Sequence, residues 1–490
     1  MTPVTRRSFI QSAAARGIAV PSLRALDAVA VTPDRPVTTA VMTALRRPLP
    51  DIQFAINDYI SPAHNLQGVT VRFPPVYTSF TTFTLTHTPT PADQATLARA
   101  LDVVEQIYPF RPNGVFTTIG YGLPYFARLP GGITGALVSS HLPRLANAPT
   151  RFAFEEAVPG PTDVGGSHPG TTKQTFNVPV QIESNDLMVM LRSDSTWILT
   201  DVINYLTGTS NQLAGRTVGR SGLRGLLVTT SSRLMFVQPG LPRQIADIHH
   251  LPYARQINPQ SPMWMGFADQ QTAGSGPPEI TTFQGNASAR LTTARAGDYF
   301  DNAAIMHLSH VIDDLAQFYA RPAEPYTERV QLMFRSNPIP SVGGRDQFTN
   351  GGGPAILDNT FQGTQDAAAS AAGINTYHGG HRIGHLSAVQ RSSRAADGTP
   401  IHIRADGPGF DSLDVPDGSA QPKLQFSIFV PTADFFRIMR LHQASLDLEQ
   451  THNVDPSHNG LERFITTTRR QNFLIPPRRH RAFPLLALQL

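Results

Sequence analysis

The chain has 490 residues, 40% hydrophobic and 16% charged, which is enough for two or three domains with sizeable cores and too apolar for charge-driven disorder. Its 40 Lys and Arg against 36 Asp and Glu leave a net charge of +4, which gives no electrostatic case for a nucleic-acid binder. The absence of cysteine excludes disulfides and cysteine-ligated metals, so a metal would need His, Asp, Glu or a prosthetic group.

The amino terminus has the pattern of an export signal. Residues 5–10 read TRRSFI, a paired arginine followed by two apolar residues, which is similar to the twin-arginine signal. Residues 11–31 are Ala-rich but interrupted by charges, and the alternative is a disordered basic tail. We predict a signal and linker over residues 1–48 and export to the periplasm or beyond, or a cytoplasmic location if the signal does not function. No apolar run of about eighteen residues is present, which predicts that the mature chain does not span a membrane.

The first half of the chain alternates between strand and helix patterns. Residues 78–87 are β-branched and aromatic, and Thr90 can cap a helix with its apolar stripe at Leu97, Leu101, Val104 and Tyr108. Later segments predict strands at 114–120, 187–191, 225–228 and 234–237 and a helix with Ile198, Val202 and Tyr205 on one face. The order βαββαβ predicts a ferredoxin-like layer.

A similar pattern returns in the second half. Ile305, Leu308, Ile312, Leu315 and Tyr319 form a helical stripe, although its first residues could equally finish a strand. After a long Gly/Ala/Asn-rich connection over residues 338–380, residues 424–430 alternate as a strand, and Thr432 can cap a helix. Two similar α+β halves therefore emerge, joined near residues 270–300.

The densest group of chemically active side chains begins at the end of the long connection. His378, His381 and His385 are followed by Arg404 and Asp406. Because neutral imidazole is a common ligand for iron, copper and zinc, the run predicts either a multi-histidine metal site or one axial haem ligand with bystanders. A solvated His-rich loop is the alternative.

A second candidate lies at residues 263–270, MWMGFADQ. Asp269 directly follows an apolar aromatic run, where burial would raise its pKa and allow proton exchange near neutrality. The alternative is a turn or N-cap aspartate.

Together these residues resemble the dye-decolourising (DyP-type) peroxidase family. Gly266-Phe267-Ala268-Asp269 matches the first four positions of the family's distal Gly-x-x-Asp-Gly motif, and Arg404 follows His385 at an offset similar to that between the family's proximal histidine and distal arginine. The sequence departs from the family where Gln270 replaces the last glycine and where Asp406 lies beside the arginine. The chain therefore resembles a divergent branch.

The resemblance implies two ferredoxin-like α+β domains of the dimeric α+β barrel-like superfamily, over residues 49–285 and 286–490, with haem in the second. It implies one haem b per chain with His385, or His381, as the iron ligand, and hydrogen peroxide as the oxidant. Asp269 and Arg404 would be catalytic, and the residues lining the haem would be Asp406, Phe426 and Phe429. The electron donor would be a small molecule of unknown identity, and the chain could form a homo-oligomer.

Three other functions are consistent with the same residues. The chain could release iron from haem, as a variation on the same chemistry. It could be a catalytically impaired relative that binds haem or another ligand, an alternative motivated by Gln270 and Asp406. It could also be a mononuclear metal binder that uses His378, His381 and His385.

Overall fold

The structure is a computed structural model, and all structural statements below concern the part of the chain that it describes. These are residues 48–60, 64–66, 69–71, 73–168, 173, 175–259, 261–265, 278–285, 291–320, 402–444, 446 and 461–489.

The first half of the chain forms one antiparallel sheet with a ferredoxin-like strand order. Its main elements are β3 (Tyr77–Leu85), α3 (Pro91–Ile107), β4 (Phe116–Tyr121), β6 (Leu187–Ser193), α6 (Thr196–Leu206) and β9 (Leu227–Phe236). The strands lie in the order β4-β6-β3-β9, and each neighbouring pair is antiparallel. This is the order expected for a βαββαβ unit with two crossover helices.

The second half repeats this arrangement. Its main elements are β10 (Ala304–Asp313), α8 (Leu315–Ala320), β11 (Ile403–Arg404), β12 (Gly407–Asp411), β13 (Gln421–Val430), α12 (Ala433–Gln443) and β14 (Ile465–Ile475). The order is β11-β13-β10-β14, with β12 also paired to β13. The predicted α+β class with two ferredoxin-like units is confirmed, and no strand ladder of the described residues closes a barrel.

The remaining elements are short. They are β1 (His64–Leu66), β2 (Val69–Val71), α4 (Leu123–Arg128), α5 (Ala136–Ser139), β5 (Gln181–Ile182), β7 (Gln212–Leu213), β8 (Arg216–Thr217), α7 (Leu241–Ile248) and 3₁₀ turns at Ala254–Gln256, Pro278–Thr281, Glu462–Phe464, Arg478–His480 and Leu486–Gln489. No described helix is both long and apolar enough to cross a membrane. The predicted export signal lies outside the described residues.

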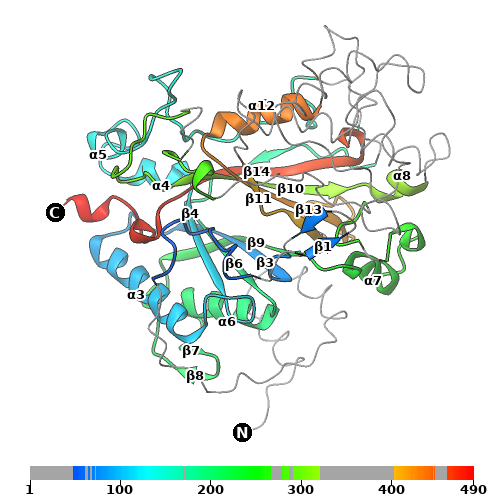
Figure 1. Ribbon diagram of the computed structural model, residues 1–490, viewed down its shortest axis with the longest axis horizontal. Helices are drawn as coiled ribbons and strands as arrows, with labels where there is room; N and C mark the ends of the chain where they lie inside the picture. Colours follow the sequence, from blue (N-terminus) through cyan, green and yellow to red (C-terminus); the bar gives the residue numbers. More distant parts are fainter. Residues whose placement is uncertain are drawn as a thin grey trace.

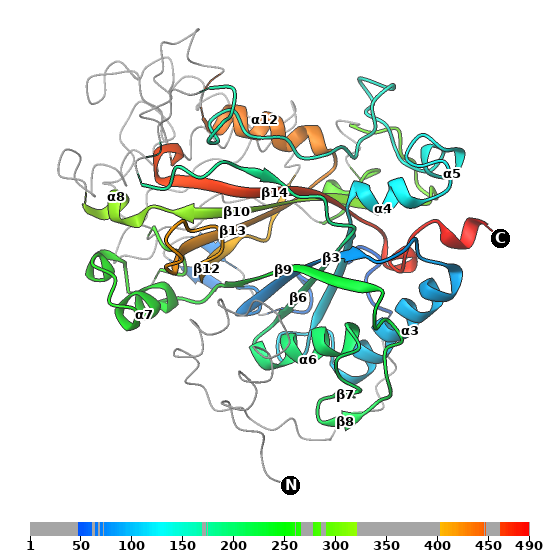
Figure 2. The same cartoon turned by 180° about the vertical axis from the view of Figure 1, so that it is seen from behind.

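The two sheets stack between helices. Figures 1 and 2 show α12 above the sheet of the second half and α3 and α6 below the sheet of the first half, so the layers run helix, sheet, sheet, helix. A second apolar cluster lies between the sheets, and we call it the inter-sheet core; it comprises Ile52, Phe54, Phe80, Met188, Met190, Met235, Ala304, Met306, Leu308, Ala405, Phe429, Phe473 and Ile475. Each sheet therefore packs against helices on one face and against the inter-sheet core on the other.

Local sequence signals explain α3. The Thr90 hydroxyl accepts from the Asp93 backbone N–H at 3.2 Å, and the Asp93 carboxylate accepts from the Thr90 N–H at 2.8 Å. This reciprocal capping box satisfies two backbone donors that a helix start leaves unpaired. The buried residues Leu97, Leu101 and Val104 then hold the helix against the sheet, as predicted from their spacing.

Two predicted elements differ from the structure. The apolar stripe at Ile305, Leu308 and Ile312 belongs to strand β10, and only residues 315–320 are helical, so the strand alternative holds for its first part. Every residue of β10 is buried, because helices cover one face and the inter-sheet core covers the other. The two strands predicted at 225–228 and 234–237 are one strand, β9, whose pairing with β3 shifts register at Phe83.

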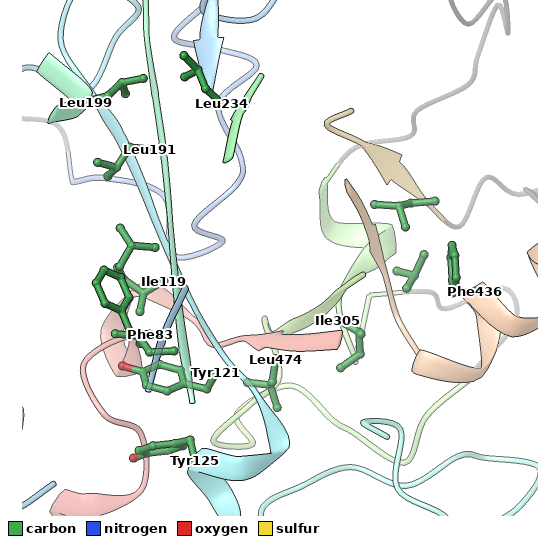
Figure 3. Packing of buried hydrophobic residues seen from close by; sticks show 14 of the residues in the cluster. Phe83, Ile119, Tyr121, Tyr125, Leu191, Leu199, Leu234, Ile305, Phe436 and Leu474 are labelled. Carbon is green, nitrogen blue, oxygen red and sulfur yellow. The ribbon is translucent and has the colours of Figure 1, made fainter. Parts of the chain in front are cut away.

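Among the described residues, one backbone pairing joins the two sheets, between Leu474 on β14 and Tyr121 on β4. Figure 3 shows these two side chains close together where the cores of the two halves meet. The Tyr121 hydroxyl donates to Arg481 O at 2.7 Å and accepts from the Phe483 N–H at 2.7 Å, so the carboxy-terminal segment is tied to the first half.

Gln53 reinforces this junction from the segment before β1. Its Nε2 donates to Ile119 O at 3.1 Å and Pro476 O at 2.7 Å, and its Oε1 accepts from the Ile119 N–H at 2.9 Å. Ile119 belongs to β4 and Pro476 directly follows β14, so one buried side chain bridges both strands.

Gln53→Leu is expected to destabilise the protein by about 1–3 kcal/mol, because it leaves buried backbone groups of Ile119 and Pro476 unpaired. Urea unfolding of the full chain measures this change. The control is Gln212→Leu at an exposed glutamine. Equal unfolding midpoints for the two variants would contradict the bridging role.

Candidate functional site

Strand register places Arg404 and Asp406 on one face of the second sheet. Arg404 pairs with Ile428 and Gly407 pairs with Gln425, so the register is unbroken and Asp406 lies opposite Phe426. Residues alternate between faces along a strand, and Ala405 points into the inter-sheet core. Arg404, Asp406 and Phe426 therefore share the opposite face, on the side covered by α12.

This face carries a partly buried charge pair. Burial raises the pKa of Asp406 above its ordinary value, and the positive charge of Arg404 opposes that rise. A carboxyl group in this environment holds a proton at higher pH than a solvated one, and the neighbouring guanidinium offers donors to a developing negative charge. The pair can therefore take part in proton transfer and anion stabilisation.

Phe429 lies on the other side of the sheet. Its ring stacks on Phe54 with centroids 4.0 Å apart and planes 12° apart, within the inter-sheet core. Phe426 and Phe429 are three residues apart on one strand, so they point in opposite directions. The structure therefore brings Phe426 together with Arg404 and separates Phe429 from both.

The other predicted site residues lie outside the described part of the chain. They are Asp269, Gln270, His378, His381 and His385. Trp264, just before the predicted distal motif, is described: its Nε1 donates to Gly409 O on β12 at 3.0 Å, and its own carbonyl accepts from the Tyr319 hydroxyl at 2.7 Å. This residue is therefore anchored beside the strand that follows Arg404.

Two buried histidines on β10 are fully engaged. Asn472 Nδ2 donates to Glu155 O, so Asn472 Oδ1, 2.7 Å from His307 Nδ1, accepts from that nitrogen. His307 Nε2 then accepts from the Ser309 hydroxyl at 2.7 Å. Burial first, and Arg470 second, lower the pKa of His307 well below its ordinary value, so it is neutral.

His310 is held on the opposite face, with Nε2 3.3 Å from Asp411 and Nδ1 3.0 Å from the Thr468 hydroxyl. Neither His307 nor His310 has a ring nitrogen free for a metal. Within the described ranges, no three His, Asp or Glu side chains gather as a metal site.

A buried ionic cluster beneath α12 was not predicted from the sequence. Arg470 on β14 binds Asp163 through two hydrogen bonds of 2.7 Å and donates to the Ser309 hydroxyl at 2.9 Å. Arg440 on α12 donates to Glu462 at 2.9 Å, and the Lys173 ammonium donates to the carbonyl of the same glutamate. The cluster lies on the same sheet face as Arg404, since Asn472 and His307 occupy the row that includes Ile428.

The one sequence signal for this cluster is the placement of charged residues inside apolar segments, such as Arg470 within β14. Their partner Asp163 lies about three hundred residues earlier, in the stretch predicted to be irregular. Only the folded chain reveals that pairing.

Asp163→Asn is expected to cost about 3–5 kcal/mol of stability at neutral pH, because it leaves the buried Arg470 without its counter-charge. Although burial opposes ionisation, Arg470 holds the pKa of Asp163 at about 2. The folded pKa is below the unfolded one, so the pair stabilises the protein above pH ~4 and this contribution is lost as the pH falls toward ~2.

Urea unfolding from pH 7 to 2 measures both effects. The natural protein should lose about 2 kcal/mol through this group between pH ~4 and ~2, a loss that the variant lacks. Parallel stability curves for the two proteins would contradict the ion pair's role.

Three comparisons with known proteins give the following. The model of a family of unknown function, DUF7405, matches residues 142–477. No curated protein matches the sequence. Among solved structures, the chain is similar to a putative DyP-type peroxidase from Shewanella oneidensis, with 13% identity, a TM-score of 0.46 and coverage of 85% of this chain and 95% of that chain.

Two further structures match to a similar degree. A DyP-type peroxidase from Cellulomonas bogoriensis has 14% identity and a TM-score of 0.46, with coverage of 86% of this chain and 95% of that one. A variant of DypB from Rhodococcus jostii, in complex with haem, has 12% identity and a TM-score of 0.46, with coverage of 84% and 96%. These structures come from the family that the sequence resembles, and at this identity they assign no residue role to this chain.

Proposed function

The chain belongs to DUF7405, a family of unknown function, and we propose that it is a haem-dependent peroxidase that uses hydrogen peroxide to oxidise a small-molecule donor. One observation carries the proposal: Arg404, Asp406 and Phe426 share the helix-covered face of the second sheet. The motif order in the sequence, from Asp269 through His385 to Arg404, supports it.

The described residues suit the distal side of a haem. Phe426 and Leu424 are only partly buried on this face, whereas Phe429 on the opposite face is fully buried. A partly covered apolar surface beside a guanidinium and a carboxyl group has the composition that a porphyrin requires: apolar contact for the ring and a few polar groups at its reacting face. His385 would hold the iron, with His381 as the alternative ligand.

Haem, when bound, supplies the redox-active iron at which peroxide is cleaved. Arg404 would donate hydrogen bonds to the oxygen that gains negative charge as the O–O bond breaks. Asp269 would move a proton from the inner to the outer peroxide oxygen. Asp406, with its raised pKa beside Arg404, is a second group able to hold that proton.

We also propose an export signal and two domains for the whole protein. Residues 1–48 would direct export by the twin-arginine route, residues 49–285 would form the first domain, and residues 286–490 would form the haem-binding domain. Because the twin-arginine route exports folded proteins, haem would be loaded before export. Localisation of the tagged chain with Arg6 and Arg7 both intact or both replaced by Lys tests this part.

Incubation of the hemin-loaded full chain with hydrogen peroxide and an oxidisable dye tests the activity. The proposal predicts dye oxidation with the porphyrin retaining its iron. Accumulation of iron-free porphyrin would instead identify an iron-releasing enzyme, and the absence of both products would identify a catalytically impaired relative. Zinc or copper without porphyrin in the purified chain would identify a metal binder.

A further inference from the structure

Arg192 on β6 is buried without a partner. It is 7% exposed, and within the described part of the chain its side chain has neither a hydrogen bond nor an ion pair; its buried Nε is unsatisfied. Burial alone lowers the pKa of Arg192 to about 10, with no contribution from a nearby charge. The other buried arginines have partners. An unpaired buried charge lowers the stability of the folded protein, so a bound ligand that supplies the counter-charge would account for this residue.

The neighbours of Arg192 face the space between the sheets. Arg192 pairs with Thr78 on β3 and with Phe116 on β4, so the three side chains form one row on the same face. That face carries Met188 and Met190, two residues apart on β6, which belong to the inter-sheet core. Thr78 is fully buried, and its hydroxyl also lacks a partner among the described residues.

The adjacent row adds further unsatisfied donors. Arg233 on β9 pairs with Phe80, which places it on the same face one row along from Thr78. Arg233 donates to Glu183 through Nη2, while its buried Nε and Nη1 are unsatisfied. Glu183 also contacts Arg469, which has Asp414 as a second and closer partner, whereas no described carboxylate pairs with Arg192.

We propose that this end of the inter-sheet space binds a small organic carboxylate, whose negative charge pairs with Arg192 and Thr78. One uncompensated guanidinium matches a monoanion, and its planar fork matches a carboxylate. The rest of the ligand would contact Phe116, Met190 and Met235, which flank this pair of residues. Methionine side chains adapt to varied apolar shapes, so an aromatic or aliphatic acid fits better than a strongly hydrated dianion.

This site is separate from the proposed haem face. Arg404 lies on the second sheet and points away from the inter-sheet core, whereas Arg192 lies on the first sheet and points toward it. Carboxylate binding therefore does not depend on haem.

Calorimetric titration of the full chain with benzoate, octanoate, acetate, inorganic phosphate and chloride tests the proposal. We expect saturable binding of benzoate or octanoate, tighter than that of acetate, phosphate or chloride. Arg192→Met should weaken it at least about tenfold, the factor that a loss of ~1.4 kcal/mol produces. Without ligand, this variant should melt no lower than the natural protein, since it removes an unpaired buried charge. Arg216→Met, at an exposed arginine, is the matched control and should bind normally.

Thr78→Val provides an independent variant if Arg192→Met does not fold. It should also weaken binding about tenfold, because it removes one hydrogen bond to a charged group. The His385→Ala variant should bind the carboxylate normally, which separates this test from that of the haem site. No binding by any probe, tightest binding of phosphate or chloride, or unchanged binding in both Arg192→Met and Thr78→Val would overturn the proposal.

Discussion

Replacing His385 with alanine is expected to abolish haem retention by the full chain. The proposed site has one protein ligand to the iron, and the buried histidines His307 and His310 have both ring nitrogens engaged, so neither can replace it. Without this histidine, hemin would be held by apolar contacts alone and would be lost on desalting. The Soret absorbance per chain after hemin loading and desalting should fall at least about tenfold, the ratio that corresponds to ~1.4 kcal/mol of binding free energy.

His381→Ala is the matched control for this experiment, because it removes a histidine from the same run. It should leave the Soret band unchanged. The reverse result, with His381→Ala colourless and His385→Ala coloured, would assign the ligand to His381. Full haem retention in both variants would remove the histidine run from the site.

Replacing Arg404 with leucine is expected to leave haem binding intact and to slow peroxide cleavage by about 10²–10³-fold, the effect of losing one preorganised donor to a developing anion. Arg404 lies on the edge strand β11, and its side chain is only partly buried. The fold should therefore tolerate the change. Stopped-flow absorbance after mixing with peroxide measures the rate.

Arg404→Lys should recover part of the rate, because an ammonium restores the charge without the planar fork of donors. Arg437→Leu, at an exposed arginine of α12, serves as the control. A natural rate of peroxide cleavage in Arg404→Leu would exclude the residue from catalysis. Loss of pigment in the same variant would make it a haem-binding residue instead.

Locally encoded elements were predictable from the sequence. The helix α3 carries its own capping box at Thr90 and Asp93 and one apolar stripe, so neighbouring residues suffice to define it. The strand β13 was likewise predictable from neighbouring residues, because its side chains alternate along the segment. The βαββαβ order of both halves followed from such segments.

The strands β9 and β10 were harder to predict. In β10, apolar residues occupy both faces, so the period of two disappears and a helical stripe can be drawn through Ile305, Leu308 and Ile312. In β9, the polar run over residues 229–232 and the buried Arg233 interrupt the apolar pattern, and the ion pair of Arg233 with Glu183 forms only in the folded chain. Tertiary burial, which the local pattern does not contain, decided both cases.

The candidate site also combines features that local strand alternation determines with features that only long-range contacts determine. Phe426 and Phe429 were both predicted to line the haem, although strand alternation puts residues three apart on opposite faces, where the structure places them. The cluster around Arg470 and Asp163 joins segments that are distant in the chain, so no local pattern marks it. The unpaired state of Arg192 likewise depends on what surrounds it after folding.

Hemin titration of the purified full chain, followed by a pyridine haemochrome assay, tests the central claim most directly. A peroxidase with its haem on the Arg404 face should bind one haem per chain, develop a Soret band and lose it in His385→Ala. A colourless protein after reconstitution, with no Soret band at any hemin concentration, would contradict the proposed function.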